Sequence, residues 1–123
     1  MKTEGLIEVI LYAQDMAAQV AFYRDILGLE IVYPAGLEDY RQEYWVVFET
    51  GSCKLVLHGG GEGKSGSDAP KIVFGVADIQ SCRAELLAAG VHVGEVRSPA
   101  PGVLVVDGRD PEGNAFSIEE HQG

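Results

Sequence analysis

The sequence has few of the residues that mark secreted or membrane proteins. Only two of its 123 residues are cysteine, Cys53 and Cys82, and their spacing fits no disulfide framework. No apolar run reaches the roughly 18 to 20 residues that a membrane helix needs. The N-terminal segment MKTEGLIEVIL carries a charge within its apolar stretch and has no small-residue cleavage site. We therefore expect a reduced, cytoplasmic protein that does not associate with membranes.

Basic residues are also scarce. Nine Lys and Arg stand against 19 Asp and Glu, which gives a formal net charge of −10. Proteins that bind nucleic acid neutralise its phosphates with clustered Lys and Arg, whereas the nine here are scattered. We expect no nucleic-acid partner, and the acidity favours solubility. The remaining composition, 46% hydrophobic and 23% charged, is that of an ordinary globular domain.

What the sequence does contain is an internal repeat. The segment EVILYAQD (residues 8–15) resembles KIVFGVAD (residues 71–78) in its order of charged, apolar and acidic residues. About twelve residues without Gly or Pro follow each aspartate, and a glycine, Gly28 or Gly90, then ends the stretch. Aspartate is a favoured N-cap residue, and glycine suits the left-handed position after a helix. The pattern predicts one helix in each copy.

Three β-like runs follow each predicted helix. They are residues 29–33, 44–49 and 54–58 in the first copy, and residues 91–96, 102–107 and 116–120 in the second. Each copy therefore predicts the order βαβββ. We expect a first half at 1–58, a Gly- and Ser-rich linker at 59–70 and a second half at 71–123, forming one domain overall.

Two segments carry a resemblance to a known family. LYAQDMAAQVAFYRDILGLEIV (residues 11–32) and DPEGNAFSIEE (residues 110–120) resemble the opening and closing segments of the vicinal oxygen chelate superfamily. That family includes glyoxalase I, extradiol dioxygenases, fosfomycin-resistance enzymes and bleomycin-binding proteins. The resemblance implies an α+β fold of two tandem βαβββ units. Their strands would form a curved mixed sheet around a cup-shaped cavity, with the helices on the outer face.

The resemblance also implies where metal ligands would stand. Position by position, the family's four ligand sites correspond to Glu8, Val56, Lys71 and Ser117. Only Glu8 is a good ligand, since valine has no donor atom, serine is a poor ligand and protonated lysine has no free lone pair. We therefore expect no metal at the usual positions and no cofactor. A divalent metal held by the shifted set Glu8, His58 and Glu119 remains an alternative.

Alternation along the strands predicts which side chains face the cup. Val9 and Leu11 suit the face that packs on a helix, and the same reasoning applies to the other strands. The candidate binding residues are Glu8, Tyr12, Trp45, His58, Lys71, Ser117 and Glu119. Lys71 could replace the positive charge of a metal and pair with Glu8 or Glu119, or these charges could be solvated strand ends.

Aromatic residues gather in residues 33–45, from the end of the first β-like run after the first predicted helix to the start of the second run. A ring at this place can stack on a planar ligand or cover the core. The sequence leaves both readings open for Tyr33, Tyr40, Tyr44 and Trp45.

Two classes of function fit these features. The first is a protein that resembles the bleomycin-binding members and binds a small molecule without a metal. The alternative is a lyase-like or dioxygenase-like enzyme, using the shifted metal set or a metal-free acid or base, for which His58 and Glu119 are the catalytic candidates. The resemblance further implies a homodimer.

Overall fold

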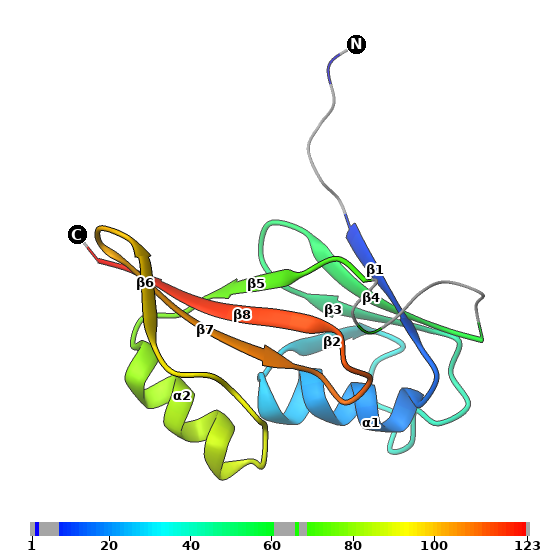
Figure 1. Ribbon diagram of the computed structural model, residues 1–123. Helices are drawn as coiled ribbons and strands as arrows, with labels where there is room; N and C mark the ends of the chain where they lie inside the picture. Colours follow the sequence, from blue (N-terminus) through cyan, green and yellow to red (C-terminus); the bar gives the residue numbers. More distant parts are fainter. Residues whose placement is uncertain (1, 3–7, 61–65, 67–68, 123) are drawn as a thin grey trace. The chain divides into compact units, whose positions relative to one another are not determined.

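The structure is a computed structural model that describes residues 2, 8–60, 66 and 69–122 (Figure 1). The chain divides into two compact units, Met1–Ser65 and Gly66–Gly123. Most of the Gly- and Ser-rich segment predicted as a linker, residues 61–65 and 67–68, lies outside the described residues.

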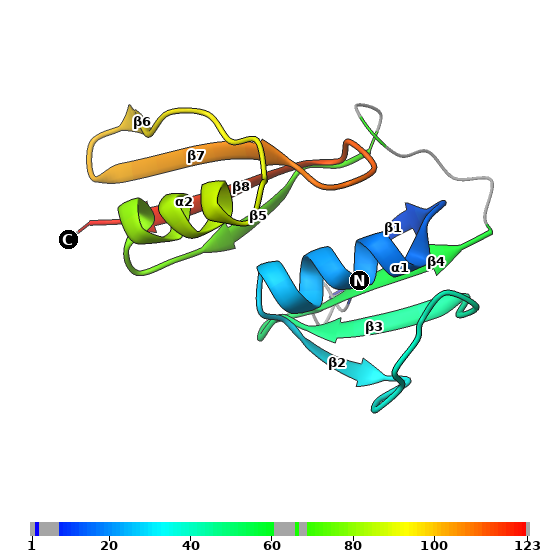
Figure 2. The ribbon, with the colours of Figure 1, turned by 90° about the horizontal axis from the view of Figure 1, so that it is seen from below.

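The first unit is a four-stranded mixed sheet with one helical segment. Its elements are β1 (Glu8–Ala13), α1 (Met16–Val20), the π-helical continuation η1 (Ala21–Ile26), β2 (Glu30–Tyr33), β3 (Trp45–Glu49) and β4 (Lys54–Gly59). The strand order is β1-β4-β3-β2. β1 runs parallel to β4, and the other neighbours are antiparallel. The helical segment lies along one face of this sheet (Figure 2).

The second unit repeats this architecture. Its elements are β5 (Ile72–Gly75), α2 (Ile79–Ala88), β6 (Arg97–Ala100), β7 (Val103–Arg109) and β8 (Ala115–His121). The strand order β5-β8-β7-β6 matches the first sheet strand for strand, and β5 is again parallel to its neighbour. The predicted pair of βαβββ units is confirmed.

The helix boundaries follow the predicted signals. The Asp15 carboxylate accepts a hydrogen bond from the Ala18 backbone N at 3.0 Å, and Asp78 accepts one from the Ser81 backbone N at 3.2 Å. Gly28 and Gly90 adopt φ of +75° and +82°, which side chains with a Cβ rarely adopt. Each unit therefore uses an N-cap aspartate and a glycine just after its helix.

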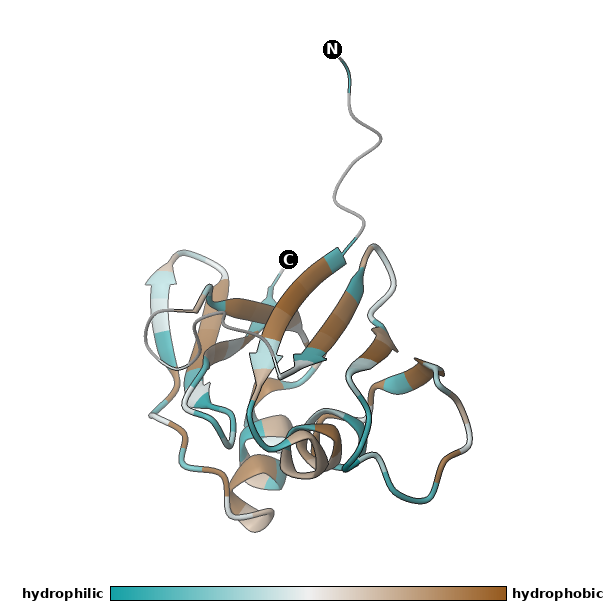
Figure 3. Cartoon of the chain, turned by 90° about the vertical axis from the view of Figure 1, so that its right-hand side faces the viewer, coloured by the Kyte–Doolittle hydropathy of each residue, from teal (hydrophilic) through white to brown (hydrophobic). Residues whose placement is uncertain are grey.

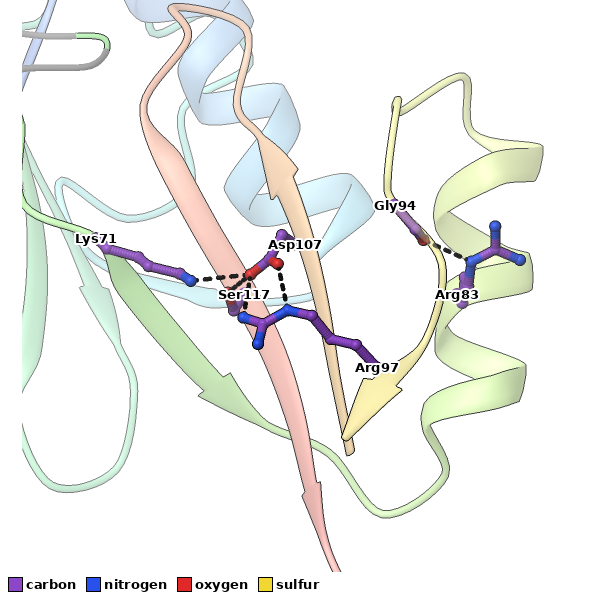
Figure 4. Close-up of polar contacts among 6 residues, drawn as sticks. All are labelled: Lys71, Arg83, Gly94, Arg97, Asp107 and Ser117. Atoms are coloured by element: carbon purple, nitrogen blue, oxygen red, sulfur yellow. Dashed lines mark hydrogen bonds and ion pairs between the residues drawn. The ribbon is translucent and has the colours of Figure 1, made fainter. Parts of the chain in front are cut away.

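One predicted strand is wrong. Residues 91–96 make a single bridge, from Val93 to Gly108, and strand β6 follows at Arg97–Ala100 instead. The stretch is bonded to the helix: the Val91 backbone N donates to the Leu86 carbonyl, and Arg83 Nε donates to the Gly94 carbonyl at 2.8 Å (Figure 4). β6 contains Pro99, which is tolerated because β6 is the edge strand of its sheet.

Each unit has its own apolar core between helix and sheet. Tyr23 is fully buried, and its ring centroid lies 6.1 Å from that of Phe48 on β3. In the second unit the core includes Ile79 and Leu86 of α2 with Val106, Phe116 and Ile118 of the sheet. Strands such as β1 and β4 are mostly hydrophobic, with hydrophilic residues toward their ends (Figure 3). Within the described part of the chain, no helix has the length and hydropathy to cross a membrane.

Candidate functional site

The first unit presents three rows of side chains on the sheet face opposite its helix, here called its open face. Phe48 contacts Tyr23 of the helix, so alternation places Trp45, Val47 and Glu49 on the other side of β3. The strand register then aligns these residues with β4 and β1. The rows are charged (Glu8, Lys54, Glu49), aliphatic (Ile10, Val56, Val47) and aromatic (Tyr12, His58, Trp45).

The aromatic row is the most distinctive feature of this face. His58 stands between Tyr12 and Trp45, with ring centroids 5.3 Å and 5.4 Å away. All three side chains are half-buried. The His58 Nδ1 atom is buried and has no hydrogen-bond partner in the described structure. The row therefore combines two aromatic side chains with one imidazole whose Nδ1 makes no hydrogen bond.

The other two rows hold an ion pair and a buried aliphatic side chain. Lys54 forms an ion pair with Glu49, and the hydrogen bond from Lys54 together with one from the Gly51 backbone N lowers the pKa of Glu49. Val56 in the aliphatic row is fully buried. Glu8 lies four residues before Tyr12 on the same strand, roughly 13 Å from the aromatic row. A single ion cannot bridge that distance, which argues against Glu8 and His58 sharing a metal.

The second unit has the same strand register but different side chains on the corresponding face. The position of the aliphatic row is occupied by Val73, Ser117 and Asp107, and that of the aromatic row by Gly75, Glu119 and Val105. Asp107 Oδ1 accepts from Lys71 Nζ at 2.8 Å and from the Ser117 hydroxyl, and Arg97 Nε donates to Oδ2 at 2.8 Å (Figure 4). The hydrogen bonds from Arg97, Lys71 and Ser117 hold the pKa of Asp107 well below its usual range.

The partners of two predicted site residues differ from expectation. Lys71 pairs with Asp107, whereas the sequence suggested Glu8 or Glu119. Glu119 lies 2.9 Å from Nε2 of His121. Sequence reasoning missed Asp107. Its signal was the strand GVLVVD, whose alternation places Asp107 on the same face as Val105, but only the register with β8 brings it beside Ser117.

The four family ligand positions do not fit a metal ion. Val56 has no donor atom, the Ser117 hydroxyl is bonded to Asp107, and the Lys71 ammonium is paired with the same carboxylate. Among the residues that the structure describes, no three His, Cys, Asp or Glu are placed to hold a metal.

The aromatic residues in segment 33–45 occupy different environments. Tyr40 is 4% exposed and its hydroxyl donates to the Pro34 carbonyl at 2.7 Å, so it belongs to the core. Tyr33 and Tyr44 are 60% and 70% exposed and lie outside the aromatic row. Trp45 is the one member of this segment that joins the row.

Comparison with known proteins agrees with this architecture. Lactoylglutathione lyase from Agrobacterium tumefaciens is 25% identical, with a TM-score of 0.73 over 98% of this chain and 96% of its own. The glyoxalase family protein from Enterococcus faecalis is 21% identical, with a TM-score of 0.73 over 95% and 98%. TnmS3, an antibiotic binding protein from Streptomyces sp. CB03234, is 18% identical, with a TM-score of 0.76 over 99% of both chains.

At 18% and 21% identity the last two comparisons bear on the fold alone. No curated protein matches the chain. A family-wide sequence profile, in contrast, matches residues 5–118, nearly the whole length. With its two βαβββ units, the chain belongs to the Glyoxalase/Bleomycin resistance protein/Dioxygenase superfamily.

Proposed function

We propose that this protein binds a small planar molecule on the open face of its first unit, without a metal ion. The observation that carries the proposal is the row Tyr12, His58 and Trp45. Aromatic side chains offer a large, rigid, apolar surface at low cost in conformational entropy, which is the usual lining of small-molecule sites. Membership of a superfamily named in part for bleomycin resistance proteins supports the same class of function.

The size of the row sets the size of the ligand. Neighbouring strands lie about 4.8 Å apart, so Tyr12 on β1 and Trp45 on β3 are separated by roughly 10 Å across β4. A flat system of two or three fused rings can cover this span and contact both aromatic side chains. A single small ring would contact one of them and lose much of the apolar contact.

A metal-free enzyme is the second candidate. His58 favours it, because an imidazole beside a bound ligand is the commonest general acid or base. Glu119, the other catalytic candidate, is already bonded to His121. The 25% sequence identity to a lactoylglutathione lyase favours an enzyme over a binding protein. Turnover of a bound ligand that is lost in His58→Gln would favour the enzyme over the binding protein.

Trp45 allows a direct test, because it is the only tryptophan in the chain. Isoquinoline, a neutral bicyclic probe in weakly alkaline buffer, should quench Trp45 fluorescence along a saturable curve. Tyr12→Leu should weaken binding about 10-fold, since it removes one aromatic surface. The control Tyr44→Leu changes a tyrosine that is 70% exposed and lies outside the row, and it should leave binding unchanged. Quenching without saturation, or equal binding by Tyr12→Leu, would refute the proposal.

A further inference from the structure

We propose that His58 selects the ligand by donating a hydrogen bond from Nε2, so that the site prefers planar aromatic molecules with a hydrogen-bond acceptor. The acceptor would be a ring nitrogen, a carbonyl or a phenolate oxygen. This inference rests on the proposed function of the aromatic row and adds a chemical rule for what the row accepts.

The two ring nitrogens of His58 differ in their surroundings. In neutral imidazole one nitrogen carries the proton and the other presents a lone pair. Nδ1 is buried without a partner, so a proton there would be an N–H with nothing to accept it. Orphaned buried N–H groups are rarer in proteins than acceptors that lack a donor. The proton therefore belongs on Nε2, which leaves Nε2 as the nitrogen that a ligand can reach.

The described neighbours of His58 in its row, Tyr12 and Trp45, offer it no carboxylate. Tyr12 meets the imidazole at an interplanar angle of 54° and Trp45 at 79°, so both present aromatic rings to it. The acidic residues of this face, Glu8 and Glu49, stand in the charged row, roughly 13 Å along the strands. A ligand acceptor is thus the group that would complete the bonding of His58.

The second unit shows the opposite chemistry at the same register position. Glu119 takes the place of His58, and an ionised carboxylate can only accept hydrogen bonds. It already has a partner in His121 at 2.9 Å. A hydrogen-bond donor at this register position therefore occurs in the first unit, as His58, and not at the corresponding Glu119 of the second.

The first test reads the tautomer directly. Long-range ¹⁵N NMR spectra of the imidazole groups in the full chain, recorded in weakly alkaline buffer, distinguish a protonated from an unprotonated ring nitrogen. His58→Gln removes one set of signals and so assigns the rest. A protonated Nε2 with a bare Nδ1 supports the inference, and a protonated Nδ1 overturns it.

The second test compares isoquinoline with naphthalene, which has the same shape but no acceptor. A net hydrogen bond of 0.5–1.5 kcal/mol corresponds to a preference of about 2- to 12-fold for isoquinoline. His58→Leu should abolish the preference, and His58→Gln, which keeps an N–H donor, should retain it.

The outcomes separate the two proposals. Saturable binding of both probes with equal affinity, or a preference that survives His58→Leu, overturns the role of His58 and leaves the planar-ligand function standing. Failure of both probes to bind saturably overturns both proposals.

Discussion

At Asp107 three donors meet one carboxylate, and the cost of protonating it makes the stability of the second unit depend on pH. The pKa of Asp107 is lowered in the folded state by hydrogen bonds from Arg97, Lys71 and Ser117. A lowered pKa means that the stabilisation is fully present above the ordinary carboxyl pKa of about 3.9. It is lost as the pH falls from there through the lowered folded pKa.

We expect Asp107→Asn to reduce the free energy of unfolding by about 1 kcal/mol at neutral pH, because the side chain is 44% exposed and solvent screens the pairs. The difference in free energy of unfolding between this variant and the unchanged protein should disappear as the pH falls below about 4. Urea midpoints measured across this range test it. Asp39→Asn, which alters an exposed carboxylate paired with Arg41, is the control and should show a smaller gap. A gap that widens in acid would contradict the assignment.

Lys71 contributes less to the free energy of unfolding than a buried ion pair would. Its side chain is 44% exposed, as is that of its partner Asp107, and Arg97 remains to pair the carboxylate when Lys71 is changed. Lys71→Met, which keeps the aliphatic stem, should therefore lower the free energy of unfolding by less than about 1 kcal/mol. Lys71→Ala should behave similarly in urea denaturation. A loss of about 3 kcal/mol would instead show an ion pair that is buried in solution.

At the scale of elements, the N-cap of α2 is a defined source of stability. Asp78 accepts a hydrogen bond from the Ser81 backbone N, and Glu120 Oε1 accepts one from the Ile79 backbone N at 2.8 Å. Asp78→Ala should cost about 1 kcal/mol, whereas Asp78→Asn keeps an acceptor and should cost far less. Thermal or urea unfolding of both variants tests this. Equal losses would mean that the negative charge, rather than the hydrogen bond, stabilises the helix.

The elements were predictable wherever the sequence carries local stop and start signals. Asp15 with Gly28, and Asp78 with Gly90, bound the helices by chemistry that acts within a few residues. The strand at residues 91–96 was mispredicted because its β-like residues are held by contacts to α2, which no local pattern reports. The ion pair between Lys71 and Asp107 was likewise not predictable from the sequence, since it depends on the register of β7 against β8.

The candidate site divides in the same way. Strand alternation was enough to place Tyr12 and His58 on the open face. That Trp45 stands directly opposite His58 required the register of β3 with β4, which also excluded Tyr44 from the row. The buried Nδ1 of His58 is a property of packing, and no sequence pattern announces it.

For the whole molecule, association into a homodimer stays a prediction. β1 and β2 are edge strands of the first sheet, and β5 and β6 are edge strands of the second. Strand edges present unpaired backbone groups that proteins often cover by assembly. Light scattering at tens of micromolar should give about twice the chain mass of 13.2 kDa. A mass of one chain under these conditions would contradict the prediction.

The matching registers of the two sheets have a consequence for how this protein can evolve. In each copy the helix-covered face maintains the fold, while the opposite face carries Tyr12, His58 and Trp45 in one copy and Gly75, Glu119 and Val105 in the other. Mutations in a few codons can therefore change the side chains on this face of one copy while the fold and the other copy keep theirs. In a repeated fold of this kind, the residues that maintain the fold and the residues that differ between the copies lie on opposite faces of each sheet and can change independently.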